Sequence, residues 1–150
     1  METAPEGVLF QVLGPFEAHV DGRPVPLGAP RHRVLLAALL THANTVVSTD
    51  RLIDIVWSDE PPTTALSTLQ KYVYRLRGSL GDRILTRPPG YLLRLESGEC
   101  DSSRFESLLA DAAALATAGE VDEAIGAFDG ALALWRGPAW AEFALSLIHI

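Results

Sequence analysis

The chain has 150 residues, 48% of them hydrophobic, and a net charge of −7, so it holds one ordinary domain, or a small domain with part of a second. No apolar stretch approaches the roughly 18 residues that cross a bilayer, the N-terminus lacks the pattern of a secretory signal, and the single cysteine cannot form an internal disulfide. We therefore expect a soluble cytoplasmic protein.

The first predicted element is a small antiparallel sheet. Residues 16–20 alternate between apolar and polar side chains, as in a strand with one buried face. Asp21-Gly22 follows as a tight hairpin signal. Residues 8–13 and 23–27 flank this strand and are predicted to pair with it.

Two helices are predicted next. Pro30 suits the first turn of a helix, and residues 34–40 are apolar nearly all round, as in a helix buried within a domain. Asn44 is predicted to end it. Ser48 is a plausible N-cap for the second helix, on which Trp57 is predicted to be a core residue.

A third helix and a second hairpin follow. Pro61-Pro62 breaks the chain, and Thr63 or Thr64 can cap a helix that runs to about Leu80. Residues 84–87 and 91–95 then flank a Pro-Pro-Gly turn. A sheet, three helices and a terminal hairpin predict an α+β winged helix-turn-helix domain.

The charge is unevenly distributed along the chain. Residues 1–97 carry ten basic and ten acidic side chains, whereas residues 98–150 carry two and nine. Within residues 63–94 six basic side chains face one acid, which is a local charge of +5. The chain therefore combines a basic module with an acidic one.

The third helix has one apolar and one basic face. Its apolar positions, spaced three and four residues apart, are predicted to face the core: Leu66, Leu69, Val73, Leu76 and Leu80. The opposite face holds no acid and presents Thr64, Ser67, Thr68, Lys71, Arg75 and Gly78, with Tyr72, Tyr74 and Arg77 at its flanks.

Such a face suits the major groove of DNA, where Arg or Lys donates to guanine and hydroxyls serve bases or phosphates. Lys71 and Arg75 are the candidates for contacts with bases. The helix start at Thr63 and Thr64 would offer backbone N–H groups to a phosphate, and Arg77 would hold the DNA backbone from the side. The alternative is a solvated helix face, but the absence of balancing carboxylates favours DNA.

The hairpin carries one further candidate. Arg87 lies beside the Pro88-Pro89-Gly90 turn, where a wing tip can reach the minor groove or a phosphate. An ordinary hairpin cation explains this residue equally well.

Two segments, residues 69–77 (LQKYVYRLR) and 86–91 (TRPPGY), together with the order of elements, resemble the OmpR/PhoB-type winged helix. More closely, they resemble the Streptomyces antibiotic regulatory protein (SARP) family. That resemblance implies a winged helix that binds direct repeats near a promoter, followed by a bacterial transcriptional activation domain of tetratricopeptide-like build. The family's recognition positions correspond to Ser67, Thr68, Lys71, Tyr72 and Arg75, and its wing arginine to Arg87.

The resemblance also implies partners. The segment between Trp57 and Thr63 matches a loop that contacts RNA polymerase in related winged helices, so it makes Ser58, Asp59 and Glu60 candidates for that contact. A polar surface loop is the alternative. The expected partners are double-stranded DNA, on which binding can be tandem or dimeric, and RNA polymerase, which places the protein in the bacterial nucleoid.

The acidic half is predicted to hold a helical pair. Ser103 and Glu106 have capping-box spacing and precede an apolar stripe that stops at Gly119. A second helix is predicted from near Asp122 to Gly137-Pro138. Because a repeat array needs about three units for stability, we expect this activation domain to be incomplete.

These patterns predict a DNA-binding domain at residues 8–97, a partial activation domain at 98–144 and a non-native tail at 145–150. The predicted function is an activator that binds promoter DNA and recruits RNA polymerase. One alternative is a helical-repeat interaction scaffold, and another is a fragment of a larger regulator with a nucleotide-binding switch. Catalytic, cofactor-binding and metal-binding motifs are absent from the sequence, so we expect neither an enzyme nor a cofactor or metal site.

Overall fold

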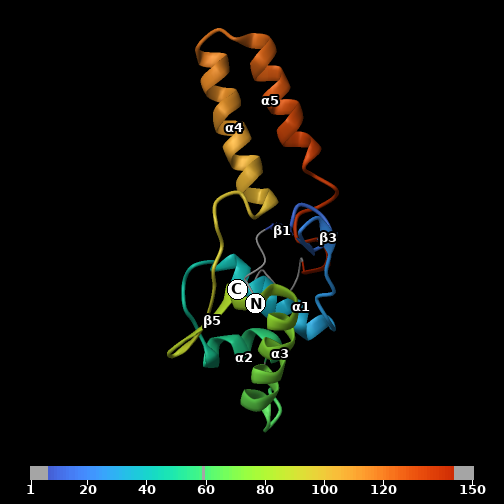
Figure 1. The fold of residues 1–150 in the computed structure, drawn as a ribbon, viewed down its shortest axis with the longest axis vertical. Helices are drawn as coiled ribbons and strands as arrows, with labels where there is room; N and C mark the ends of the chain where they lie inside the picture. The colour runs from blue at the N-terminus through green and yellow to red at the C-terminus, as the bar shows by residue number, and fades with distance from the viewer. Residues whose placement is uncertain (1–6, 59, 144–150) are drawn as a thin grey trace. The chain divides into compact units, whose positions relative to one another are not determined.

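The protein is described here by a computed structural model, which covers residues 7–58 and 60–143 (Figure 1). The predicted tail at 145–150 lies outside these residues. The chain divides into two compact units, the first built on Ala18–Leu95 and the second on Leu9–Glu17 together with Glu96–Glu142. None of the helices in the described part is long and apolar enough to span a membrane.

The N-terminal sheet has the strand order β1-β2-β3, formed by β1 (Val8–Gln11), β2 (Glu17–Val20) and β3 (Arg23–Pro24). Strands β2 and β3 are antiparallel, with Val20 opposite Arg23. The predicted hairpin turn is present: Asp21 and Gly22 both have positive φ, 52° and 81°, as the Asp-Gly turn requires. Strand β3 is shorter than predicted, because only two of its residues pair.

Three helices follow in the first unit: α1 (Pro30–Thr41), α2 (Thr49–Trp57) and α3 (Ala65–Leu80). Pro30 occupies the first turn of α1, as predicted. The Ser48 hydroxyl accepts a hydrogen bond from the Arg51 amide at 3.1 Å, which confirms it as the N-cap of α2. Trp57 is buried. Asn44 adopts a left-handed conformation after α1, with φ 65°.

The predicted second hairpin is also present. A short turn, η1 (Gly81–Arg83), leads into β5 (Ile84–Arg87), and β6 (Gly90–Leu93) returns antiparallel to it with Thr86 opposite Tyr91. Strand β4 (Val47–Ser48) completes the sheet in the order β4-β6-β5. Strand β4 was not predicted, because two residues are too few to show an alternation.

The core of the first unit lies where α1 packs against α2, α3 and β6. Its fully buried side chains come from all four elements and include Leu36 and Leu39 of α1, Leu52 of α2, Leu69 and Val73 of α3, and Leu93 of β6. These contacts hold α3 against the core by its apolar side.

The second unit contains an antiparallel helical pair, α4 (Asp101–Thr117) and α5 (Val121–Ala133), followed by the short turn η2 (Ala141–Phe143) (Figure 1). Gly119 joins the two helices with φ 83°. The helices approach closely because small side chains lie between them, and Ala112, Ala124 and Ala131 are buried.

The predicted stop of the first helix at Gly119 and the start of the second near Asp122 agree with the structure, but the two outer ends were wrong. Helix α4 begins at Asp101, with Cys100 as its N-cap, so Ser103 lies inside the helix and does not cap it. Helix α5 ends at Ala133 rather than at Gly137. Trp135 lies beyond the helix, and its ring packs edge-on against Phe105 at a centroid distance of 5.4 Å.

The second unit also includes residues Leu9–Glu17, which were not predicted to belong to it. The Phe10 amide donates to the Glu99 carbonyl at 2.7 Å. The Val12 and Leu13 amides donate to the two carboxylate oxygens of Asp101, at 2.8 and 3.1 Å. Residues 9–17 are thus a structural part of the acidic unit.

Candidate nucleic-acid interface

Helix α3 is held by its buried apolar side chains and leaves its other side exposed. Leu69, Val73, Leu76 and Leu80 are buried, as predicted. Among the sixteen residues of the helix there is no Asp or Glu, and the basic residues are Lys71, Arg75 and Arg77. The exposed side therefore carries positive charge that no acid on the same helix offsets.

The prediction for Leu66 was wrong. Its side chain is 53% exposed, and Ala65 is buried in its place. The first turn of α3 thus faces the core through a neighbouring position, which rotates the exposed surface of the helix toward residues 66, 70 and 74. Gln70 is exposed, and Tyr74, at 78%, is among the most exposed large side chains of the described chain.

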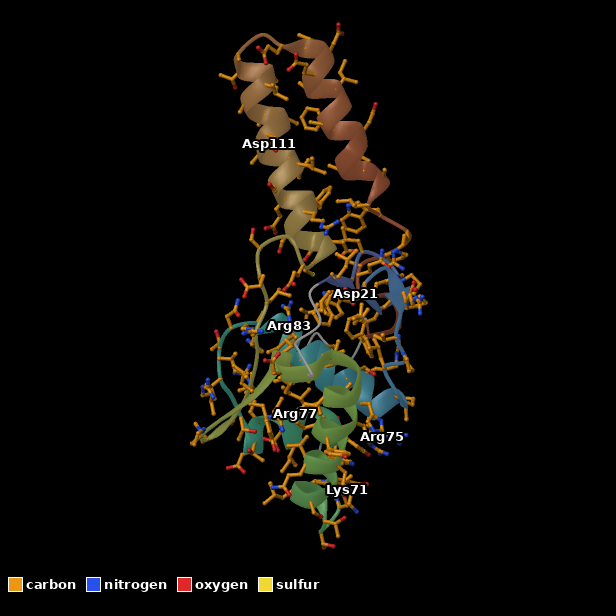
Figure 2. All side chains as sticks on the ribbon, in the orientation of Figure 1. Asp21, Lys71, Arg75, Arg77, Arg83 and Asp111 are labelled. Carbon is orange, nitrogen blue, oxygen red and sulfur yellow. The ribbon has the colours of Figure 1, made fainter. Side chains whose placement is uncertain are left out.

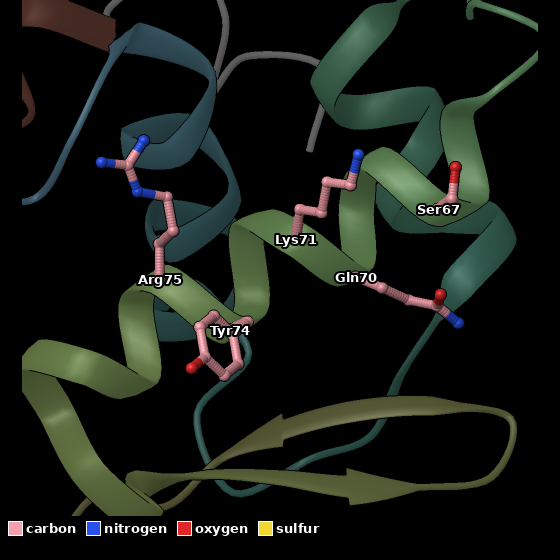
Figure 3. A pocket seen from close by; sticks show the side chains of 5 residues that line it. All are labelled: Ser67, Gln70, Lys71, Tyr74 and Arg75. Carbon is pink, nitrogen blue, oxygen red and sulfur yellow. The ribbon is translucent and has the colours of Figure 1, made fainter.

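The exposed side of α3 forms an open hollow of about 510 Å³, lined by Ser67, Gln70, Lys71, Tyr74 and Arg75. Figure 3 shows Lys71 and Arg75 pointing to the same side of the helix, one turn apart. Gln70 and Tyr74 were not among the predicted site residues. Their i, i+4 spacing with Leu66 was the available signal, and it was missed because Leu66 was placed in the core.

The hydroxyl groups at the start of α3 bond to one another and to the backbone. Thr64 is the N-cap residue, but its side chain makes no capping hydrogen bond. The Ser67 hydroxyl donates to the Thr64 carbonyl at 3.1 Å, and the Thr68 hydroxyl to that of Thr64 at 3.4 Å. Of these three residues, Ser67 also lines the hollow.

Tyr72 lies apart from this exposed side. Its ring stacks on Trp57 with centroids 5.8 Å apart and contacts the His32 ring at 4.1 Å. The tyrosine is half-buried and joins α3 to α2 and α1. The structure therefore places this predicted recognition residue in an aromatic cluster inside the domain.

His32 supports α3 from the start of α1. The ring Nδ1 accepts a hydrogen bond from the Ala29 amide at 3.2 Å, which replaces the Glu or Gln of a capping box. Burial of the ring, and second the nearby Arg75 guanidinium, hold the pKa of His32 below its ordinary value, although the bond from Ala29 opposes them. The imidazole is thereby favoured as the neutral form.

Arg77 points away from Lys71 and Arg75, toward the hairpin (Figure 2). Its Nε donates to the Ile84 carbonyl at 2.9 Å, and Nη2 donates to the Thr86 hydroxyl at 2.7 Å. The guanidinium carbon also lies 5.8 Å from the centroid of the Tyr91 ring. This arginine binds the last turn of α3 to β5.

The hairpin turn is anchored at its back and carries Arg87 at its edge. The amide and the hydroxyl of Thr49 both donate to the Pro89 carbonyl at 3.1 Å, and Pro88-Pro89 is a cis peptide bond. A side chain at Gly90 would collide with the Val47 carbonyl. Arg87 is exposed and donates to the Thr86 carbonyl at 3.1 Å, so its side chain lies at the surface of the wing.

The other basic residues of this region are engaged within the protein. Arg94 forms an exposed ion pair with Asp82 at 3.5 Å, and Arg83 is buried. The basic residues of the third helix and hairpin that are fully exposed are Lys71, Arg75 and Arg87.

The loop between α2 and α3 presents two of the three residues predicted to contact polymerase. Ser58 and Glu60 are exposed, and the Glu60 amide donates to the Trp57 carbonyl at 3.2 Å. Asp59 lies outside the described residues.

Comparison with protein families identifies both halves of the chain. Residues 22–93 match the family described as "Transcriptional regulatory protein, C terminal", the OmpR/PhoB-type winged helix. Residues 100–148 match "Bacterial transcriptional activator domain". The chain belongs to the SARP-family regulators.

Curated proteins with similar sequences support the same family assignment. The Mycobacterium tuberculosis transcriptional regulatory protein MoaR1 is 37% identical over 93% of this chain, which corresponds to 48% of MoaR1. The regulatory protein DnrI of Streptomyces peucetius is 35% identical over 89% of this chain and 53% of its own length. The regulatory protein AfsR of Streptomyces coelicolor is 37% identical over 88% of this chain but only 14% of AfsR. The chain thus spans about half the length, or less, of these curated relatives.

A solved structure shares the fold of the SARP-family chain. Mycobacterium tuberculosis EmbR, in complex with a low-affinity phosphopeptide, superposes with a TM-score of 0.85 at 33% sequence identity. The match covers 95% of this chain and 42% of EmbR. It confirms the predicted winged helix followed by helices.

Proposed function

We propose that this chain binds double-stranded DNA through α3 and the β5–β6 wing and thereby regulates transcription. The observation that carries the proposal is the exposed side of α3, where Lys71 and Arg75 stand beside Gln70 with no acid on the helix. Arg and Lys donate to guanine, and Gln pairs with adenine through its amide. An exposed helix with these three groups has the donors and acceptors that base recognition requires.

The wing and the helix start supply contacts of another kind. Arg87 is exposed at the hairpin edge, where a cation can neutralise a phosphate or enter the minor groove. At the N-terminal turn of α3 the Thr64 side chain caps no backbone N–H, and the Ala65 amide donates to the Pro62 carbonyl at 3.0 Å. The next amides of the turn, at Leu66 and Ser67, are therefore the candidates for a phosphate contact. These contacts would orient α3 on the duplex, whereas Gln70, Lys71 and Arg75 would read bases.

The test is selection of a binding site by the whole chain from random duplexes, followed by footprinting and titration at several salt concentrations. Arg75→Glu is compared with Arg23→Glu, because Arg23 is exposed on β3 and both variants change the net charge equally. We expect Arg75→Glu to abolish selection and Arg23→Glu to retain it. Equal losses for the two variants, or no salt-dependent binding by the wild-type chain, would refute the proposal.

A finer measurement separates base contacts from phosphate contacts. Arg75→Ala should weaken binding to the selected site by about 1 to 3 kcal/mol if Arg75 reads a base, while binding to unrelated duplexes changes less. Equal weakening on all sequences would make Arg75 a phosphate contact.

We further propose RNA polymerase as a partner of the α2–α3 loop. Ser58 and Glu60 are exposed beside the DNA-binding helix, at the positions where related winged helices contact polymerase. Replacing Ser58, Asp59 and Glu60 by alanine should leave affinity for the selected duplex unchanged and reduce transcription in vitro. Unchanged transcription would show that this loop is not part of the activation surface.

We also propose tandem or dimeric binding on DNA. The footprints of the wild-type chain on the selected duplex test it, because they count the half-sites that are occupied.

A further inference from the structure

Arg77 makes three contacts that cross from the recognition helix to the wing. Its Nε–H donates to the Ile84 carbonyl at 2.9 Å, and its Nη2–H donates to the Thr86 hydroxyl at 2.7 Å. The third contact is with the Tyr91 ring, 5.8 Å from the guanidinium carbon. All three partners belong to the hairpin, on β5 and β6, while Arg77 itself belongs to the last turn of α3.

The geometry of these contacts restricts the arginine. A guanidinium is a planar fork, so two hydrogen bonds and one ring face define its orientation. Tyr91 is buried and pairs with Thr86 across the hairpin. Arg77 therefore holds one cross-strand pair of the wing at a set place relative to the helix, next to the strand position that carries Arg87.

We propose that Arg77 is a positioning residue that fixes the wing relative to the recognition helix. This inference rests on the proposed DNA binding. Lys71 and Arg75 lie on α3, whereas Arg87 lies on the wing. All three add to the affinity for DNA only if the helix and the wing reach the same duplex at once. A preformed arrangement avoids the entropy cost of ordering the wing during binding. Without Arg77, Arg87 would add little to affinity.

A direct phosphate contact by Arg77 is the competing explanation, because three of its five N–H donors make no contact described above. The two roles differ in what they predict for other residues. A phosphate contact by Arg77 acts independently of Arg87, so the losses of binding free energy from replacing each residue add in the double variant. A positioning role makes the effect of Arg87 depend on Arg77, although the two side chains do not contact each other in the described structure.

The experiment is a double-mutant cycle of Arg77→Met and Arg87→Ala in the whole chain. The probe is the duplex of roughly 30 base pairs, or three helical turns, selected by the wild-type chain. We expect Arg87→Ala to weaken binding roughly three- to tenfold in the wild-type background and less than about twofold in the Arg77→Met background. Additive losses would overturn the inference.

Two variants sharpen the cycle. Arg77→Lys keeps the positive charge but loses the planar fork, so a positioning role predicts that it behaves like Arg77→Met, and a phosphate contact predicts that it behaves like the wild type. Thr86→Val removes only the hydroxyl acceptor and should also reduce the effect of Arg87→Ala. Thermal unfolding checks each fold, and if Arg77→Met unfolds, Thr86→Val provides the same comparison.

The outcomes distinguish this inference from the proposed function. If the wild-type chain selects no duplex, DNA binding itself fails and the inference fails with it. If the wild-type chain selects a duplex but the losses are additive, DNA binding stands and the positioning role is refuted.

Discussion

The carboxylate of Asp101 accepts a hydrogen bond from the backbone amide of Val12 at 2.8 Å, across 89 positions of sequence. The other carboxylate oxygen accepts from the Leu13 amide at 3.1 Å, and Asp101 is buried. Arg136 bonds to the same segment through the Pro15 carbonyl at 2.8 Å and the Glu17 carboxylate at 2.7 Å. The helical unit therefore includes contacts with residues that precede α1, α2 and α3 in the sequence.

Asp101→Asn should destabilise the helical unit. The amide group can accept only one of the two bonds and leaves a backbone N–H facing another donor, at a cost of about 1 to 3 kcal/mol. Asp111→Asn is the control, because Asp111 is exposed on the same helix and its replacement should change stability by less than about 0.5 kcal/mol. Urea unfolding followed by circular dichroism measures both. Equal stabilities would show that the two amides find other partners.

Leu66 and Leu69 test the observed rotation of α3. Leu69→Ala removes a fully buried side chain and should cost about 2 to 5 kcal/mol of unfolding free energy. Leu66→Ala removes one that is 53% exposed, so its cost should be below about 1 kcal/mol. Chemical denaturation of the two variants measures both unfolding free energies. Comparable losses of unfolding free energy for the two variants would mean that Leu66 is a core residue, which would contradict its observed exposure.

Gly90 and Gly78 should respond in opposite directions to alanine. A Cβ at Gly90 collides with the Val47 carbonyl, so Gly90→Ala must separate β4 from β6 and should cost more than about 1 kcal/mol. A Cβ at Gly78 meets no atom within 4 Å, so Gly78→Ala should stabilise α3 by about 0.5 to 1 kcal/mol. Melting temperatures give the sign of each change. A stable Gly90→Ala protein would argue against the β4–β6 pairing.

His32 should make stability depend on pH. Burial and the Arg75 guanidinium lower its pKa in the folded chain, so below the ordinary histidine pKa of about 6.5 the unfolded chain binds the proton more readily. Neutral His32 therefore makes its full contribution to the free energy of unfolding above about pH 6.5, and this contribution is lost as the pH falls through the lowered pKa of the folded chain. His32→Gln, which can still accept the Ala29 amide, should show a smaller loss of stability between pH 8 and pH 5. A loss equal to that of the wild-type chain would mean that His32 titrates normally.

Local patterns predicted much of this protein because they report on interactions between near neighbours. The Asp21-Gly22 turn, Pro30 at the start of α1 and the Ser48 cap each depend on a few adjacent residues. The basic side of α3 was predictable for the same reason: helical spacing places Lys71 and Arg75 together, and residues 65–80 contain no acid.

Other features depend on residues distant in sequence. Leu66 is as apolar as Leu69, and only the packing of α1 and α2 decides which of them the core accepts. The same applies to Arg77, whose charge suggested DNA but whose fork meets Ile84 and Thr86, and to Tyr72, which stacks on Trp57.

The sequence by itself determined the helices and the two hairpins, several of the turns, and the contrast between a basic segment at residues 63–94 and an acidic C-terminal half, because helix periodicity and turn chemistry are local properties. Only the tertiary structure decided which side of α3 is exposed, which cations are engaged internally, and that residues 9–17 complete the acidic unit. Those outcomes depend on the competition of distant side chains for the same buried space and the same hydrogen-bonding groups.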